Sequence, residues 1–209
     1  MDKFSQFKLD ILKEIGNIGA GNAATSLSLL LNKPINMTVP SVRIASFDET
    51  MELAGGPEHV VAVVYLRMEG ELEGSMFFVL SIQQAVGFIQ KMTGNPMFSF
   101  DYEQLDEFSL SALQELGNII AGSYLSALSD FTGMRISPSV PELGIDMAGA
   151  ILGYGLVEFS QVGDFAIIID TFLSESDVVD EQDINGHFFL LPSPESFGAI
   201  FNALGVNED

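Results

Sequence analysis

Apolar and polar residues repeat with a helical period in two long stretches of this chain, 5–31 and 103–132. In each stretch, apolar or small residues return every three or four positions, which is typical of an amphipathic helix with one buried side. Asp101 is a fair N-cap for the second stretch. Two shorter stretches, 82–93 and 194–204, have the same period and are followed by Gly94 and Gly205, a common helix stop. The pattern therefore predicts two long and two short helices.

Between these helices, β-branched and aromatic residues alternate with the period of two that strands require. In the first half they predict strands at 60–68 and 70–80, joined by a tight hairpin at 68–71. In the second half they predict strands at 148–160, 165–173 and 184–191. The acidic stretch 174–183 is expected to be a solvated loop. The only plausible linker, 94–103, is short and aromatic, so the halves should pack together.

The chain contains an internal repeat. The segment LKEIGNIGAG beginning at Leu12 returns as LQELGNIIAG beginning at Leu113, an offset of 101 residues that holds without a gap to Pro40 and Pro141. A later Phe-Phe pair at 77–78 also returns, at 188–189. A fixed offset over such a length is evidence of duplication. We expect one domain over residues 1–209, made of two pseudo-symmetric repeats at about 5–95 and 103–205.

Each long helix should have one packed face and one free face. The packed face of the first contains glycines, and glycine inside a helix costs about 1 kcal/mol unless a close approach compensates for it; its members are Leu12, Ile15, Gly16, Gly19, Ala23, Leu27 and Leu30, and Gly117 corresponds in the second helix. The free face carries a carboxylate and a carboxamide among small residues: Asp10, Glu14, Asn17, Gly21, Ala24 and Ser28 in the first helix, and Ser111, Glu115, Asn118, Gly122, Leu125 and Ser129 in the second.

A single Glu-x-x-Asn on a helix is usually only a polar face. Here it occurs twice in register, each time with a proline 23 residues after the asparagine. Neighbouring exposed positions do not match, since Lys13 corresponds to Gln114 and Asn22 to Ser123. Duplication preserves nothing on a surface by itself, so the repeated pair favours function over shared ancestry.

Composition removes several classes of function. There is no cysteine in 209 residues, which excludes disulfides, thiolate metal sites and a cysteine nucleophile. His59 and His187 each lie alone in strand-like stretches and are expected to be satisfied sheet residues. The formal net charge of −21 argues against nucleic acid and anionic membranes and favours a partner with a basic patch. The apolar runs are shorter than the ~20 residues of a membrane helix, so we expect a cytoplasmic protein without membrane insertion.

A carboxylate and an amide one helical turn apart do not include an activated nucleophile, but they can bind a partner's side chain and position a water molecule. An asparagine amide can orient a water for attack on phosphorus, and a glutamate can bind a lysine of the partner. Such a site is incomplete and would need magnesium and charge stabilisation from a phosphorylated partner. Paired carboxylates for glycoside hydrolysis are disfavoured because Asp10 becomes Ser111 in the second copy. GNIGAGNA lies in a helical pattern and is not a dinucleotide loop.

These residues resemble the CheC family of bacterial chemotaxis phosphatases (CheC, CheX and FliY), whose signature is Asp or Ser, then Glu, Asn and Pro at fixed spacing. Asp10, Glu14, Asn17 and Pro40 match it once, and Ser111, Glu115, Asn118 and Pro141 match it again. The resemblance covers essentially the whole chain, and the lack of terminal additions favours CheC over FliY. It implies an α+β fold: a tandem duplication of an α-β-β-β-α unit, with a mostly antiparallel sheet and two long helices that present the sites.

The resemblance also implies a function, hydrolysis of the aspartyl phosphate of the response regulator CheY. By carry-over, Glu14 and Glu115 would contact the regulator's lysine, and Asn17 and Asn118 would orient the water. Asp10, Ser111, Pro40 and Pro141 would support them. No cofactor of its own is expected, and the receptor deamidase CheD is expected as a second partner. The alternative function is a non-catalytic binding module that regulates CheD or a flagellar-switch component.

Overall fold

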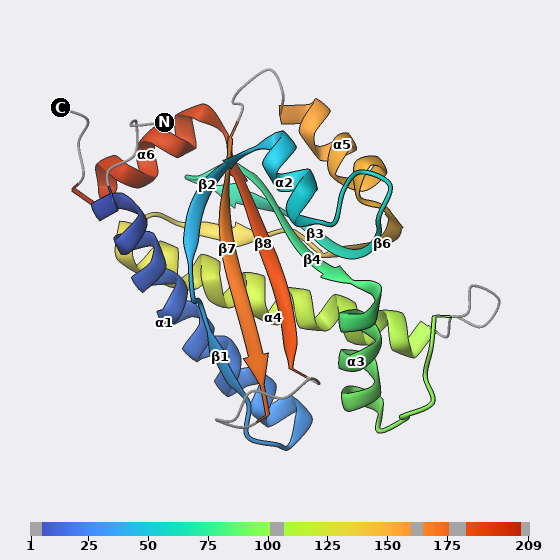
Figure 1. Ribbon diagram of the computed structural model, residues 1–209. Coiled ribbons are helices and arrows are strands. Elements are labelled where there is room, and N and C mark those ends of the chain that lie inside the picture. The colour runs from blue at the N-terminus through green and yellow to red at the C-terminus, as the bar shows by residue number, and fades with distance from the viewer. Residues whose placement is uncertain (1–5, 101–106, 160–164, 176–182, 206–209) are drawn as a thin grey trace.

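The computed structural model describes residues 6–100, 107–159, 165–175 and 183–205 (Figure 1). Each half has the same order of elements: a long helix, two short strands, a helix, two long strands and a last helix. In the first half these are α1 (Gln6–Leu31), β1 (Asn36–Thr38), β2 (Val42–Ser46), α2 (Phe47–Leu53), β3 (Val60–Gly70), β4 (Gly74–Ser81) and α3 (Ile82–Thr93). In the second they are α4 (Glu107–Thr132), β5 (Ile136–Pro138), β6 (Glu142–Met147), α5 (Ala148–Phe159), β7 (Phe165–Ser174), β8 (Ile184–Pro192) and α6 (Pro194–Ala203).

Within the described ranges, eight strands form one antiparallel sheet in the order β1-β7-β8-β4-β3-β5. In addition, β2 pairs with β7 and β6 pairs with β3. The duplicated Phe-Phe pairs meet at its centre, where Phe78 lies opposite Phe188 with their ring centroids 4.6 Å apart. The short strands of each half pair with a long strand of the other half. The expected α+β fold, duplication and antiparallel sheet are thus confirmed, but the repeated unit is α-β-β-α-β-β-α and not the expected α-β-β-β-α.

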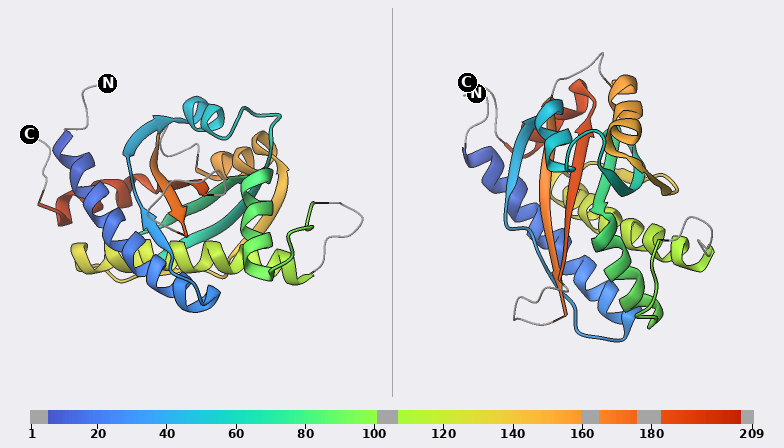
Figure 2. Two further views of the ribbon diagram at one scale, coloured as in Figure 1. Left: turned by 60° about the horizontal axis from the view of Figure 1, so that its bottom comes forward. Right: turned by 45° about the vertical axis from the view of Figure 1, so that its right-hand side comes forward.

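The two faces of the sheet are covered by different helices (Figure 2). Because side chains alternate along a strand, Val64 and Phe78 join a core beneath α1, α3, α4 and α6, whereas Val63 and Phe77 join a second core beneath α2 and α5. The long helices α1 and α4 pack beside each other on the first face. Their outer sides are therefore left free.

Local signals in the sequence account for several helix ends. The two long helices end at corresponding residues with left-handed backbone, Asn32 at φ 51° and Gly133 at φ 70°. For α3, the Ser81 hydroxyl accepts from the Gln84 N–H at its start, and left-handed Gly94 caps its end, as predicted. The proposed N-cap Asp101 lies outside the described residues. Along the described ranges, no helix is long and apolar enough to cross a membrane.

Some predicted elements were wrong. The stretch 148–160, predicted as a strand, is the helix α5, whose Ala148 and Leu152 lie one turn apart and are buried against the second core. A short apolar run cannot be assigned to helix or strand by periodicity alone, which explains the error. The hairpin turn lies at 71–73 instead of 68–71, because Met68 still pairs with Gly74. The short strands β1, β2, β5 and β6 and the helix α2 were not predicted.

One polar network joins three strands directly after Pro40. The carboxylate of Asp170 on β7 accepts a hydrogen bond from the Ser41 hydroxyl, lies 3.2 Å from Arg43 Nη2 and lies 2.8 Å from His187 Nδ1. Burial would raise the pKa of Asp170, but the hydrogen bonds from His187 and Ser41 and the charge of Arg43 hold that pKa below its ordinary value. His187 is thus a satisfied sheet residue, as predicted. His59 is not, since it lies exposed in the bend before β3.

We expect Asp170→Asn to destabilise the protein at pH 7, and the difference from the wild type to shrink below about pH 4. The folded-state pKa of Asp170 lies below the unfolded value of about 3.9. The ionised carboxylate therefore stabilises the fold above that pH, and the stabilisation is lost as pH falls through the folded pKa. Urea unfolding at pH 7, 5 and 3.5 measures this, with exposed Glu58→Gln as the control. A difference that stays constant with pH would contradict the assignment.

Candidate functional site

The sequence-predicted site residues lie on the outer sides of α1 and α4. Glu14 and Glu115 are exposed, and Asn17 and Asn118, one turn further along, are half-buried. The inner sides of the two helices meet at Gly19, where an added Cβ would lie 2.5 Å from Tyr124 Cδ1. The predicted close approach at this glycine is confirmed. The two Glu-Asn pairs therefore belong to separate sites, one on each long helix.

In the first site the asparagine is tied to the strand edge that carries the proline. Asn17 Oδ1 accepts from the Val39 N–H at 3.0 Å, and its Nδ2 donates to the Lys13 carbonyl at 3.0 Å and to the Val39 carbonyl at 3.4 Å. Val39 is 1% exposed. Pro40 follows, in the break between β1 and β2. Proline has no backbone N–H, and it is tolerated where the chain donates no hydrogen bond to a neighbouring strand.

The second site has the same residues in a different arrangement. Among the described residues, the side chain of Asn118 has one polar contact, a long one of 3.5 Å from its Nδ2 to Glu115 Oε2. The proline loop is instead held by Gln114, whose amide donates to the Pro141 carbonyl. Val140, the counterpart of Val39, is 81% exposed. Asn118 thus keeps donors and an acceptor free for a bound molecule, whereas Asn17 uses most of its own.

The role of Gln114 was missed by sequence reasoning. In the sequence, Gln114 and Lys13 are only two corresponding positions that do not match. This mismatch accounts for part of the difference between the two sites. The Gln114 amide donates to the Pro141 carbonyl, whereas no described interaction joins the Lys13 side chain to Pro40. A mismatch beside two matched residues was the available signal. It could not be interpreted without knowing that the strand edge lies against the helix.

The supporting residues differ in what they touch. Asp10 is exposed and accepts from Gln6 Nε2 at 2.9 Å, while its counterpart Ser111 is exposed. Pro40 is exposed and Pro141 is half-buried. The first site thus has one more carboxylate at its edge than the second.

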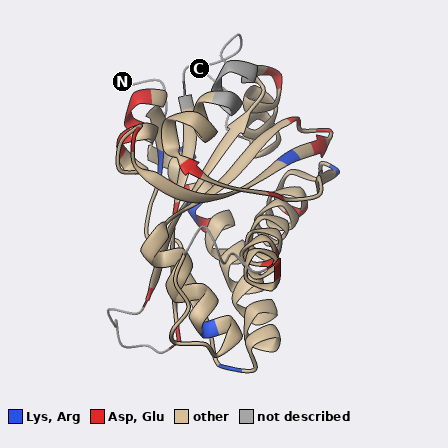
Figure 3. Ribbon diagram, turned by 90° about the vertical axis from the view of Figure 1, so that its right-hand side faces the viewer, with Lys and Arg blue, Asp and Glu red and all other residues tan. Residues whose placement is uncertain are grey.

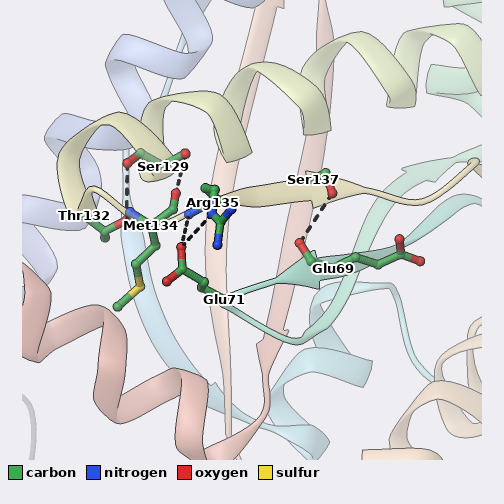
Figure 4. Close-up of polar contacts among 7 residues, drawn as sticks. All are labelled: Glu69, Glu71, Ser129, Thr132, Met134, Arg135 and Ser137. Atoms are coloured by element: carbon green, nitrogen blue, oxygen red, sulfur yellow. Dashed lines mark hydrogen bonds and ion pairs between the residues drawn. The ribbon is translucent and has the colours of Figure 1, made fainter.

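Several residues assigned to the free face do not belong there. Leu125 was expected to be exposed but is 2% exposed, because it packs in the main core. The matched serines bind the backbone that follows each helix: Ser28 Oγ accepts from the Ile35 N–H at 2.9 Å, and Ser129 donates to the Met134 carbonyl (Figure 4). These serines hold the turn, so the usable face ends before them. Leu30, expected to be buried, is exposed.

The charges around the two sites are unbalanced. Neither Glu14 nor Glu115 forms an ion pair with any described residue. Several basic side chains elsewhere do: Arg135 pairs with Glu71 at 3.4 Å (Figure 4), and Lys33 and Lys91 both pair with Glu175 at 3.5 Å. Figure 3 shows how few basic residues the protein has beside its acidic ones. The described ranges contain no cluster of metal-ligating side chains. A cation that meets these glutamates would have to come from a partner.

The different states of the two proline loops can be tested by chemical labelling. The chain has no cysteine, so a single introduced thiol is the only one that reacts. We expect Val140→Cys to react with a thiol reagent at least about tenfold faster than Val39→Cys, because reaction of a buried thiol must wait for local opening. The rates are followed by absorbance at neutral pH, and unfolding in urea should make the two rates equal. Equal rates in the folded proteins would show that the loops do not differ.

Comparison with known proteins connects these sites to a family. Residues 7–44 and 108–145, which contain both sites, match the CheC-like family. The CheY-P phosphatase CheC of Bacillus subtilis strain 168 is 50% identical over 202 residues, covering 96% of this chain and 95% of that one. The crystal structure of Thermotoga maritima FliY has the same fold, with a TM-score of 0.73 at 24% identity, covering 98% of this chain and 99% of that one.

A more distant structure shares the fold as well. It comes from the CheX-CheY-BeF3-Mg2+ complex of Borrelia burgdorferi, with a TM-score of 0.50 at 21% identity, covering 83% of this chain and 95% of that one. The Bacillus protein is similar over nearly the full length of both chains, and the two matched segments contain both sites. This protein therefore belongs to the CheC family.

Proposed function

We propose that this protein is a phosphatase of the phosphorylated chemotaxis response regulator CheY. The observation that carries the proposal is the Glu-Asn pair on a free helix face, present twice in segments that match the CheC-like family. The activity named for the relative of 50% identity supports it. Each exposed helix face is open enough for another protein to dock, as a protein substrate requires.

Each helix face supplies two functions. The unpaired Glu14 or Glu115 accepts hydrogen bonds from the ammonium group of the regulator's lysine, which sets the register of docking. The amide of Asn17 or Asn118 orients a water in line with the acyl phosphate bond, since its carbonyl oxygen accepts and its NH2 donates. The water oxygen forms a bond to phosphorus while the bond to the aspartyl oxygen breaks. The products are the aspartate carboxylate and dihydrogen phosphate.

The chain's own residues leave the charge on the phosphate uncompensated. No cluster of ligands for magnesium exists among the described residues, and the faces around the two sites are acidic. The regulator is therefore expected to bring the magnesium ion that neutralises the phosphoryl oxygens. In the first site, Asn17 must release at least one contact with Val39 before both of its polar atoms can serve the water.

The direct test measures the lifetime of phosphorylated CheY with and without this protein. The regulator is phosphorylated with a small-molecule donor, the donor is removed, and the remaining phosphate is followed with time. A catalytic amount of the protein should shorten the lifetime over many turnovers. Regulator activated by beryllofluoride, which mimics the phosphoryl group, should bind without turnover. Unchanged phosphate lifetime at any protein concentration would overturn the proposal.

The proposal includes a second partner, the deamidase CheD. It also includes a cytoplasmic location, where the protein would meet both CheY and CheD. The family resemblance suggests this partner, and a binding module that acts only through it is the alternative function. The alternative predicts a tight complex with CheD and no effect on phosphate lifetime. Binding to CheD should not change in a variant that lacks Asn17 and Asn118. Titration calorimetry with that variant separates the two functions.

A further inference from the structure

An exposed phenylalanine precedes the Glu-Asn pair in each repeat. Phe7 on α1 is 63% exposed and Phe108 on α4 is 65% exposed. They are separated by the repeat offset of 101 residues, so they occupy the same position in the two copies. Large aromatic side chains are seldom left so open, because each exposes a large apolar area to water. Because both exposed residues occupy the same position in the repeat, one explanation should account for the exposure of both.

The phenylalanines lie on the same helix face as the site residues. Phe7 precedes Asp10 by three residues, Glu14 by seven and Asn17 by ten, and each of these spacings returns to one side of a helix. Four residues beyond Glu14, Ile18 continues the strip and is also exposed. On α4 the same spacing joins Phe108 to the second pair. Each glutamate therefore has an exposed phenylalanine two turns before it, and on α1 the strip also includes the exposed Ile18, whereas its counterpart Ile119 packs against the core.

Two other pairs of corresponding positions in the long helices do not keep their chemistry. Gln6 corresponds to Glu107, and the exposed Leu29 corresponds to Asp130. Core residues match because packing requires them to, but Phe7 and Phe108 are not part of either core cluster. The remaining shared property of the two phenylalanines is their place beside the Glu-Asn pairs.

We propose that Phe7 and Phe108 are docking anchors for the phosphorylated response regulator, one at each site. This inference rests on the proposed function and adds to it the apolar contact that a protein substrate needs. The partner at Phe108 is the regulator itself, because Phe108 lies on the same helix face as Glu115 and Asn118. A regulator that places its lysine at Glu115 and its phosphate at Asn118 also covers Phe108. Aromatic side chains that become fully desolvated carry a large share of binding energy at interfaces. The carboxylates alone would give orientation with little affinity, because exposed ion pairs are weak.

The chain offers a matched control for this proposal. Phe131 is also an exposed phenylalanine on α4, but it is 16 residues from Glu115 and therefore points to the other side of the helix. In α1, Leu30 has the corresponding place relative to Glu14. Replacing either control residue removes a similar apolar group from the same helix without touching the face of the site.

The experiment isolates one site and compares the two phenylalanines. In an Asn17→Ala background only the second site remains active, and Phe108→Ala should raise the KM for phosphorylated CheY about tenfold or more while kcat changes less than about twofold. Phe131→Ala should leave both constants unchanged, and Phe108→Leu should restore most of the lost affinity. The mirror experiment uses Phe7→Ala and Leu30→Ala in an Asn118→Ala background. Circular dichroism and urea unfolding check that each variant folds.

The possible failures are distinguishable. If the Asn17→Ala parent and the wild type both lack phosphatase activity, the proposed function fails. If the parent is active but Phe108→Ala has the KM of Phe131→Ala, or lowers kcat instead of raising KM, the anchor is overturned and the proposed function stands. An equal rise of KM in both variants would also overturn it, because the effect would then be independent of the face.

Discussion

A variant with both Asn17→Ala and Asn118→Ala is expected to leave the phosphate of CheY with the lifetime that it has in buffer alone. The two amides are the groups proposed to orient water. Each offers both a donor and an acceptor, and they occupy corresponding positions beside the two glutamates. Loss of positioning costs a factor of about 100 or more in rate. Each single variant should keep the activity of the remaining site. The phosphate-lifetime assay measures all three proteins.

The control for this experiment is Asn22→Ala. Asn22 is exposed on the same helix, five residues after Asn17, and its counterpart is Ser123, so it has no repeated partner. The same chemical change at this position should leave phosphate hydrolysis at the wild-type rate. A double variant that still shortens the phosphate lifetime would show that other groups orient the water. Circular dichroism and urea unfolding check that the double variant is folded.

Gly19→Ala is expected to destabilise the protein by about 1–3 kcal/mol, the usual range for overpacking. Its Cβ would lie 2.5 Å from Tyr124 Cδ1 and 3.0 Å from the Tyr124 backbone Cα. A ring can turn away, but the backbone of the adjacent helix cannot move without separating α1 from α4. Gly117→Ala should act in the same way, because its Cβ would meet the branched side chain of Val64 at 2.5 Å. Both effects are measured as the free energy of unfolding in urea.

Gly21→Ala provides the opposite result on the same helix. An added Cβ at Gly21 has no atom within 4 Å, and alanine is the better helix former by about 1 kcal/mol. We expect this variant to be more stable than the wild type by about 0.5–1 kcal/mol. If Gly19→Ala and Gly21→Ala changed the free energy of unfolding in the same direction, the change would reflect helix propensity and not the contact between the helices.

Much of the architecture follows from the repeat. The helical period gives α1 and α3 within one residue of their observed ends, and the duplicated phenylalanine pairs mark the strands that meet at the centre of the sheet. The strands β1 and β5 have three residues each, too few for a period to be recognised. They exist because the neighbouring long strands offer free backbone groups, which is a tertiary effect. The stretch 148–160 was assigned to a strand for another reason, because its run of apolar residues fits a helix as well as a strand.

The position of the candidate site residues on the two long helices was predictable, but their contacts were not. Spacing alone places Glu14 and Asn17 on one exposed helix face, and the structure has them there. The hydrogen bonds of Asn17 to Val39 and of Gln114 to Pro141 join residues more than 20 positions apart, and no periodicity describes such contacts. Leu125 was placed on the free face because helical spacing puts it there, but the course of the neighbouring chain covers it.

The exchange of edge strands between the halves limits what the duplication can protect. Two sites give redundancy of chemistry, since a substitution that ruins one asparagine spares the other. They give no redundancy of folding, because β1 and β2 pair with β7, and β5 and β6 pair with β3. A substitution that unfolds either half removes a sheet neighbour from the other. Selection can therefore relax at one site face while it remains strict throughout the shared sheet.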